Sequence, residues 1–155
     1  MLYRWIKRAV LLSMIGSPLC AGSAHAGLGG DVAGALADGS ELHGIVNSIT
    51  LATYDIQEIT ADAGMRVREY VNRDGVVFAV SWTGPALPDL RRLLGAHYGE
   101  YAAALAALNH PGLHRTLQVA LPGLIVESGG HLRAYAGRAL LPALVPAGVL
   151  AADLL

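Results

Sequence analysis

The pair Asp74-Gly75 is the feature that most constrains how this chain can fold. It lies between two runs rich in β-branched and aromatic residues. An Asp-Gly pair accepts the positive φ angles of a two-residue type I′ turn, so the pattern predicts an antiparallel hairpin. The predicted register consists of four facing pairs: Arg73 with Val76, Val71 with Phe78, Glu69 with Val80, and Val67 with Trp82.

Alternation of side chains along the two strands separates an apolar face from a polar one. The predicted core face carries Val67, Val71, Phe78, Val80 and Trp82. The other face, predicted to be amphipathic or exposed to water, carries Arg66, Arg68, Tyr70, Ala79, Ser81 and Thr83. Glu69 falls on the apolar face. A buried carboxylate there is either functional, as an acid/base group or a buried switch, or structural, at a sheet edge or paired with an arginine.

The remaining elements follow from periodicity and turn residues. Strands are predicted over residues 48–60, 65–72, 75–83 and 124–127, with a candidate strand over 117–121. A tight turn at Gly129-Gly130 would lead into a strand over residues 131–136, with Ser128 facing His131, Val126 facing Arg133 and Leu124 facing Tyr135. Leucines at helical spacing predict one main helix over residues 88–108.

These elements define an α+β fold in which an antiparallel sheet of about five strands packs on one main helix. Residues 27–44 are rich in glycine, alanine and aspartate and are expected to form a loose leader, with one short helical turn near residues 32–37. The apolar C-terminal tail, residues 139–155, is interrupted by Pro142 and Pro146. It is expected to wrap the core rather than cross a membrane.

The first 26 residues have the pattern of a signal peptide. Arg4, Lys7 and Arg8 precede a short apolar run, and Ala24-His25-Ala26 fits an A-x-A cleavage site. We therefore expect an exported protein, periplasmic or secreted, whose single domain spans residues 27–155. Lipid attachment at Cys20 is the alternative, although Leu19 stands where a small residue is expected.

Cleavage after Ala26 would leave 129 residues, which suffices for one domain. It would remove Cys20, the only cysteine, and with it any disulfide or thiol chemistry. The mature chain would then contain eight arginines and 12 acidic residues, which gives it a net negative charge. This mild acidity argues against a general nucleic-acid-binding protein.

Motifs spread over nearly the whole mature chain resemble domain-of-unknown-function family 2844. They are Gly27-Leu-Gly-Gly30 after the leader, Tyr54-Asp-Ile-Gln-Glu-Ile59, Val67-Arg-Glu-Tyr-Val71, Val77-Phe-Ala-Val-Ser-Trp82 with Gly84-Pro85, Pro88-Asp-Leu90 with Leu93-Leu-Gly95, Ser128-Gly-Gly-His-Leu-Arg133, Gly137-Arg138-Ala139 and Leu141-Pro142. Residues 102–119 contribute nothing to this resemblance. The resemblance implies a small exported bacterial protein and no established activity.

Three groups of residues are candidates for chemistry. Ser128 and His131 in the predicted hairpin suggest a nucleophile and a base, but Val126 replaces the first glycine of a G-x-S-x-G elbow, and a polar turn is the alternative. His110 and His114 have the i, i+4 spacing of metal ligands on a helix, and His97 or His131 could join them. Pro111-Gly112 prevents that helix, so no metal site and no cofactor are predicted.

The third group combines arginines with tyrosines. Arg66, Arg68, Tyr70, Arg133 and Tyr135 are predicted to bind an anionic ligand, a glycan or a lipid headgroup, with Arg138 as a further arginine nearby. The alternative is that the arginines pair with Asp55, Glu58 and Glu69 across the sheet.

Three functional hypotheses follow. The first is an exported, non-enzymatic module that binds a ligand or an envelope component; its partner is not identified, and nucleic acid and a transmembrane span in the mature chain are not expected. The second is a small periplasmic hydrolase that uses Ser128, His131 and Glu127 or Glu69. The third is a structural or assembly protein that docks through residues 140–155. The absence of an assembled catalytic motif favours the first over an enzyme.

Overall fold

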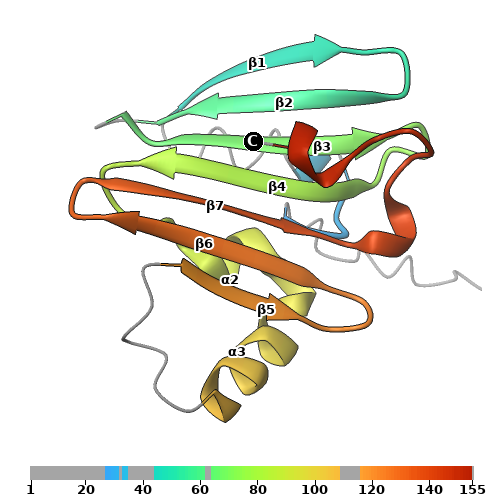
Figure 1. Ribbon diagram of the computed structural model, residues 1–155. Helices are drawn as coiled ribbons and strands as arrows, with labels where there is room; N and C mark the ends of the chain where they lie inside the picture. The colour runs from blue at the N-terminus through green and yellow to red at the C-terminus, as the bar shows by residue number, and fades with distance from the viewer. Residues whose placement is uncertain (1–26, 32, 35–43, 62–63, 109–115, 155) are drawn as a thin grey trace, which may run out of the picture.

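In the residues that the structure describes, seven strands form one antiparallel sheet in the order β1-β2-β3-β4-β7-β6-β5 (Figure 1). The computed structural model describes residues 27–31, 33–34, 44–61, 64–108 and 116–154. The strands are β1 (Ile45–Thr50), β2 (Tyr54–Thr60), β3 (Arg66–Asn72), β4 (Val77–Gly84), β5 (Thr116–Ala120), β6 (Ile125–His131) and β7 (Ala134–Leu140). Helices α2 (Leu90–Leu94) and α3 (Tyr98–Ala107) follow β4, joined by the 3-10 turn η2 (Gly95–His97). The α+β class with one antiparallel sheet is confirmed, but the sheet has seven strands rather than five.

One of the additional strands comes from the segment 48–60, which was expected to be a single strand. It bends back on itself, and the Leu51 N–H donates to the Tyr54 carbonyl at 3.0 Å to close the turn between β1 and β2. Ala52 and Thr53 lie at the tip of this turn. Since neither glycine nor proline occurs there, the usual composition signal of a turn is missing.

The predicted hairpin at Asp74-Gly75 exists, but its loop has three residues instead of two. The Asn72 N–H donates to the Val76 carbonyl, and the Asn72 side chain accepts from the N–H groups of Asp74 and Val76. Gly75 adopts a φ of 79°, which favours glycine. The longer loop bonds Val76 to Asn72, and the returning strand β4 begins at Val77 rather than at Gly75.

A bulge at Phe78 then restores the predicted register. Val71 pairs with Val77 and Tyr70 with Ala79, so Phe78 is the extra residue. Further along, the predicted pairs of Glu69 with Val80 and of Val67 with Trp82 are confirmed. The bulge turns the Phe78 ring to the opposite face from the one predicted.

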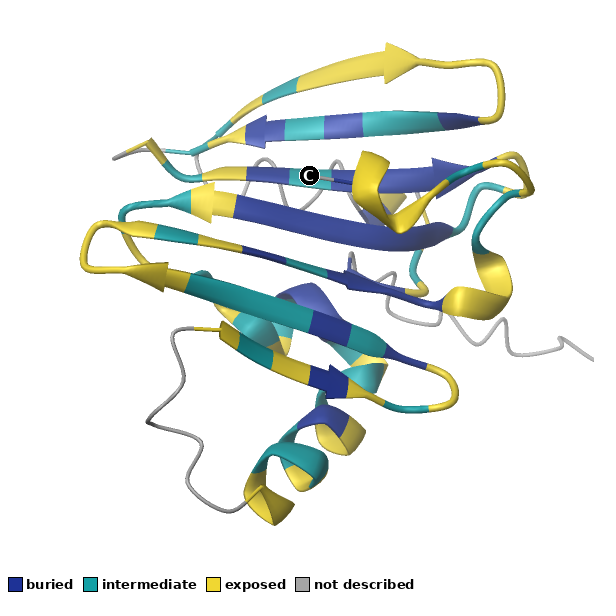
Figure 2. Cartoon of the chain, in the orientation of Figure 1, coloured by how far each residue is buried: buried dark blue, intermediate teal, exposed yellow. Residues whose placement is uncertain are grey.

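Both faces of the central strands are buried, and β4 is buried along nearly all of its length (Figure 2). We call the face against which α2 and α3 pack the helix side; its core includes Val67, Val71, Val80, Trp82, Leu94, Tyr101 and Val126. We call the opposite face the tail side; its core consists of Tyr54, Tyr70, Phe78, Ala79, Leu140 and Leu154. The second face was expected to be amphipathic or exposed to water, and exposure to water is wrong at Tyr70, Ala79 and Ser81, which are all buried.

Glu69 lies on the helix side, fully buried, as the register predicts. It faces Gln57 on β2 and Val80 on β4, so it belongs to the interior of the sheet. The interpretation of Glu69 as a sheet-edge residue is therefore wrong.

The predicted helix is interrupted at Gly95, and the N-terminal segment packs against the chain at this point. Asp89 caps α2 by accepting from the N–H groups of Arg91 and Arg92, and α2 ends at Gly95 with a φ of 52°. The Leu28 N–H donates to the Leu93 carbonyl at 2.9 Å, which the end of the helix leaves free.

The same N-terminal segment also joins the sheet. The Gly29 N–H donates to the Val77 carbonyl, the Val77 N–H donates to the Gly30 carbonyl, and Asp31 forms a bridge with Val76. Leu28 is 2% exposed in the helix-side core. Residues 27–31 are therefore part of the fold rather than a loose leader, whereas most of the predicted turn at 32–37 lies outside the described residues.

The second predicted hairpin has a different turn. Gly129 and Gly130 continue β6, and the chain reverses at Leu132 and Arg133, where Arg133 has a φ of 67°. Ser128 consequently faces Gly137, and Gly130 faces Tyr135. The predicted register would have placed Arg133 opposite the core residue Val126, whereas the observed register places buried Ala139 there.

The C-terminal tail covers the middle of the tail side. It begins where the Leu141 N–H donates to the Phe78 carbonyl, and it includes the 3-10 turns η4 (Pro142–Leu144) and η5 (Ala151–Asp153). Leu154 is completely buried among the aromatic rings, and Val145 and Val149 pack beside it.

We predict that Gly137→Ala and Gly99→Ala change stability in opposite directions. A Cβ at Gly137 would overlap Cζ2 of Trp82 and lie 2.6 Å from the Glu127 carbonyl oxygen, so overpacking should lower the free energy of unfolding by about 1–3 kcal/mol. Gly99 lies in α3 with open space around it, so alanine should raise stability by up to about 1 kcal/mol. Urea unfolding of both variants measures the difference; equal effects would contradict the close contact of β7 with Trp82.

Candidate binding surface on the tail side of the sheet

One row of polar side chains crosses all seven strands on the tail side. Strand pairing places its members directly opposite one another: Asn47, Glu58, Arg68, Ser81, Arg138, Glu127 and Gln118, from β1 to β5 in sheet order. The row is arranged almost symmetrically about Ser81, with an arginine, a glutamate and an amide on each side. Each arginine is therefore neighboured by a carboxylate on the next strand outward.

These neighbours are bonded to one another. The Arg68 Nε donates to Glu58 Oε2 at 2.7 Å, and the Arg138 Nε donates to Glu127 Oε2 at 2.7 Å. The other oxygen of Glu127 accepts from the Gln118 amide at 2.9 Å. At the centre, the Ser81 and Tyr70 hydroxyls are 3.2 Å apart. The row is thus close to neutral, because the arginine and the glutamate of each ion pair carry opposite charges.

Partial burial strengthens the first of these pairs. The Arg68 side chain is 31% exposed and that of Glu58 is 18% exposed, so solvent screens their interaction less than at an open surface. The hydrogen bond to Glu58 raises the pKa of the Arg68 guanidinium above its ordinary value. Burial likewise raises the pKa of the Tyr54 hydroxyl beside Tyr70. Both groups therefore keep their ordinary protonation at neutral pH.

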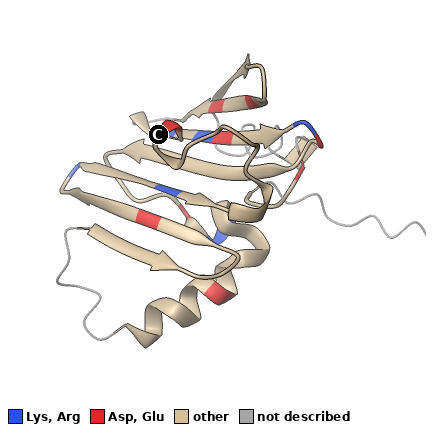
Figure 3. Ribbon diagram, turned by 45° about the vertical axis from the view of Figure 1, so that its right-hand side comes forward, with Lys and Arg blue, Asp and Glu red and all other residues tan. Residues whose placement is uncertain are grey.

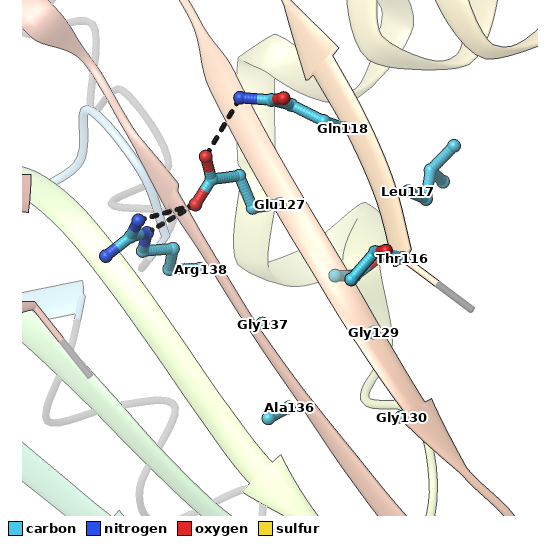
Figure 4. A pocket seen from close by; sticks show the side chains of 10 residues that line it. Thr116, Leu117, Gln118, Glu127, Gly129, Gly130, Ala136, Gly137 and Arg138 are labelled. Carbon is cyan, nitrogen blue, oxygen red and sulfur yellow. Dashed lines mark hydrogen bonds and ion pairs between the residues drawn. The ribbon is translucent and has the colours of Figure 1, made fainter. Parts of the chain in front are cut away.

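The tail covers only part of this face. An Arg138 N–H donates to the Ala151 carbonyl, which ties η5 to the row. Over β5, β6 and β7 the face remains open and forms a groove of about 520 Å³ (Figure 4). Its lining residues are Thr116, Leu117, Gln118, Glu127, Ser128, Gly129, Gly130, Ala136, Gly137 and Arg138.

The groove has a flat floor and one polar end. Gly129, Gly130 and Ala136 form a floor without large side chains, as Figure 4 shows. Gln118, Glu127 and Arg138 form the polar end through the hydrogen bonds described above. Such a surface can receive a ligand with one flat apolar side and hydrogen-bonding groups along its rim.

The five residues predicted to bind a ligand are divided between three places. Arg66, Arg68 and Tyr70 share the tail side of β3, where Arg66 Nε lies 3.9 Å from Glu58 and Tyr70 is 1% exposed. Arg133 lies in the exposed turn between β6 and β7. Tyr135 alternates with Ala136 and therefore points to the helix side. Ligand binding by these residues stays a prediction.

Charged residues in the described part of the chain are dispersed (Figure 3). Acidic and basic positions are interspersed, and some are paired, as Arg73 Nη1 and Asp55 are at 3.2 Å. The alternative interpretation, that arginines pair across the sheet, therefore describes Arg66 and Arg68 with Glu58 as their partner.

The cross-strand pairing of Ser128 with His131 is wrong. Both residues lie on β6, three positions apart, so their side chains point to opposite faces of the sheet. The His131 ring instead lies 3.3 Å from the Leu132 carbonyl oxygen. The described geometry thus assembles no Ser–His dyad at this hairpin.

The histidines considered as metal ligands are only partly placed by the structure. His110 and His114 lie outside the described residues. His97 lies 2.7 Å from Glu100. Within the described ranges, no group of three or more His, Cys, Asp or Glu side chains is arranged to hold a metal ion. None of the helices in those ranges is long and apolar enough to span a membrane.

Arg138 and Glu127 were both candidates from the sequence, but they were not expected to lie in one site with Gln118. The missing information was the turn position: once Leu132 and Arg133 form the turn, Glu127 faces Arg138. The sequence did contain a signal for this pair. Glu127 and Arg138 lie equally far along the chain from the two turn residues, and opposite charges that face each other stabilise a hairpin.

The chain belongs to a family described as "Protein of unknown function (DUF2844)", whose model matches residues 24–154. This confirms the resemblance inferred from the motifs. Neither the curated proteins nor the solved structures contain a match to the chain.

We predict that the tail depends on Leu154 far more than on Leu150. Leu154→Ala removes a side chain that is completely buried among Tyr54, Tyr70 and Phe78, and should lower the free energy of unfolding by about 2–5 kcal/mol. Leu150 is 66% exposed, so Leu150→Ala should change it by less than about 0.5 kcal/mol. Urea unfolding compares the two; similar losses would show that the tail does not seal the aromatic cluster.

Proposed function

We propose that this protein is an exported, non-enzymatic module that binds a neutral, hydroxyl-rich ligand, such as a glycan segment of the cell envelope, in the groove over β5, β6 and β7. The observation that carries the proposal is the open floor of Gly129, Gly130 and Ala136 beside the bonded side chains of Gln118, Glu127 and Arg138.

The charge of the polar end supports a neutral ligand. Glu127 and Arg138 are within 2.6 Å of each other, so each largely compensates the charge that the other would offer to an ion. Their side chains nevertheless remain 33% and 17% exposed. A carboxylate has about four lone-pair sites, so Glu127 can accept further hydrogen bonds from hydroxyl groups.

The floor supports a ligand with a flat side. Glycine and alanine leave the backbone of β6 and β7 close to the groove, where a sugar ring can lie without displacing a side chain. The lining is mostly uncharged, which limits the cost of removing water from it. These features favour a glycan over the free anion also considered from the sequence.

Export is the second part of the proposal. Its support is the basic start, apolar run and A-x-A site of residues 1–26. Gly27 would become the first residue after cleavage. A Cβ at Gly27 would lie 2.7 Å from the Arg92 carbonyl oxygen, so glycine fits the close packing at this position. A chain that starts at Gly27 retains residues 27–31 and their hydrogen bonds to Leu93 and Val77, so cleavage at this point is compatible with the fold.

We predict that Ala136→Phe abolishes glycan binding. The ring would fill the floor of the groove from a position that is exposed and needs no repacking. The measurement is an amide NMR titration with chitotetraose and with a soluble muropeptide. In the unmodified protein, at least one probe should shift the resonances of Gly129 and Gly130.

Ala134→Phe is the matched control for the groove variant. Ala134 is also exposed on β7, two positions nearer the turn, and it does not line the groove. It should bind the same probe as the unmodified protein. Equal loss in both variants, or shifts confined to another surface, would contradict the groove as the binding site.

We predict that export removes residues 1–26 and leaves Gly27 as the N-terminus. The measurement is intact mass and N-terminal sequencing of the protein recovered from the periplasmic fraction of a bacterial host that expresses the full chain. A cytoplasmic protein that retains Met1 would contradict export. A lipid-modified chain that begins at Cys20 would support the lipoprotein alternative instead.

A further inference from the structure

We infer that strand β1 is an interface for a second copy of this chain, which pairs with it antiparallel and extends the sheet. Strand β1 is an edge of the seven-stranded sheet, and its residues from Ile45 to Thr50 are mostly exposed. Figure 1 shows it as the outermost strand on the side remote from α2 and α3. This inference is independent of the groove over β5, β6 and β7.

The backbone of β1 has a regular set of outward-facing groups. The hydrogen bond from the Leu51 N–H to the Tyr54 carbonyl marks these two residues as a hydrogen-bonded pair. Such pairs recur at every second position of an antiparallel ladder, so Ile45, Asn47 and Ile49 direct their backbone groups toward β2. Val46, Ser48 and Thr50 direct theirs outward, where the described part of the chain provides no partner strand.

A second copy of β1 fits this edge in a definite register. If two strands meet about a two-fold axis at Asn47, then Val46 of each copy faces Ser48 of the other. These are the residues whose backbone groups point outward, so the new ladder is complete at its centre. The sides of the sheet also match, because residues that face each other across the axis differ by an even number of positions.

The same register covers the exposed apolar side chains of β1. Ile45 is 77% exposed and Ile49 is 43% exposed, and both lie on the tail side. In the paired strands Ile45 of each copy lies opposite Ile49 of the other. Cross-strand pairs of β-branched residues stabilise a sheet, so the contact is self-complementary.

Strand β1 also lacks the features that keep sheet edges from pairing. Residues 44–54 contain no charged residue and no proline, and β1 pairs with β2 without a bulge. The opposite edge differs, because α3 lies against β5 there. The edge at β1 is therefore the one that fits another strand.

The first test is the mass of the purified protein by sedimentation equilibrium over a wide concentration range. We expect a reversible transition to twice the mass of one chain. The double variant Ile45→Lys and Ile49→Lys places lysines opposite one another in the pair and should remain a monomer. Leu150→Lys, at another exposed leucine, is the control and should associate like the unmodified protein.

Circular dichroism of the double variant establishes that it folds, which is expected because both isoleucines are on the edge strand. A protein that stays monomeric at every concentration overturns the inference. So does a dimer that the two lysines leave unchanged. If β1 binds a strand of a different protein instead, the isolated chain is a monomer, which also overturns the inference as stated.

A second test determines the register in which the two β1 strands pair. In a Cys20→Ser background, Asn47→Cys would bring the two cysteines together at the axis in a non-hydrogen-bonded pair, at a separation that allows a disulfide. We expect oxidation to yield a cross-linked dimer. Ile49→Cys is the matched control, because it faces Ile45 of the other copy and should yield little. Equal cross-linking by both variants overturns the proposed register.

Discussion

The burial of β3 and β4 on both faces is the constraint on which the rest of the structure depends. A sheet that is buried on both faces needs a covering layer on each of them, and few segments outside the strands can supply one. Helices α2 and α3 cover one side with Leu94 and Tyr101, and the tail covers the other with Leu154. The bulge at Phe78 supplies an aromatic ring to the second side, which gives the tail a surface on which to pack.

Local sequence signals predicted the centre of the fold well. Asp74-Gly75 located the hairpin, and Val67 with Trp82 and Glu69 with Val80 pair as predicted. The face of Phe78 could not be predicted, because two one-residue shifts, in the loop and at the bulge, compensate each other in the register. Nothing in the composition of the two strands marks either shift.

The candidate site could be predicted only in part, because it depends on pairing between distant strands. Arg68 was expected on a polar face, and it lies there with Glu58 as its partner. To predict the groove, one must know the register of β6 with β7. The pair Gly129-Gly130 indicated the wrong register, because it suggested the wrong turn position. Gly130 is a glycine because the backbone at Ala134 approaches it closely, not because the chain turns there. The same glycine pair is therefore compatible with a turn and with a close approach of two strands. Only the tertiary contacts distinguish these two interpretations.

The position of Leu154 has a consequence for the order of events during biogenesis. The tail-side cluster cannot close until the ribosome has synthesised almost the entire chain, since its last member is residue 154. Strand β4 must also wait for β7, which begins 50 residues after β4 ends. Both faces of β4 therefore acquire their complete covering only when synthesis of the chain is nearly finished.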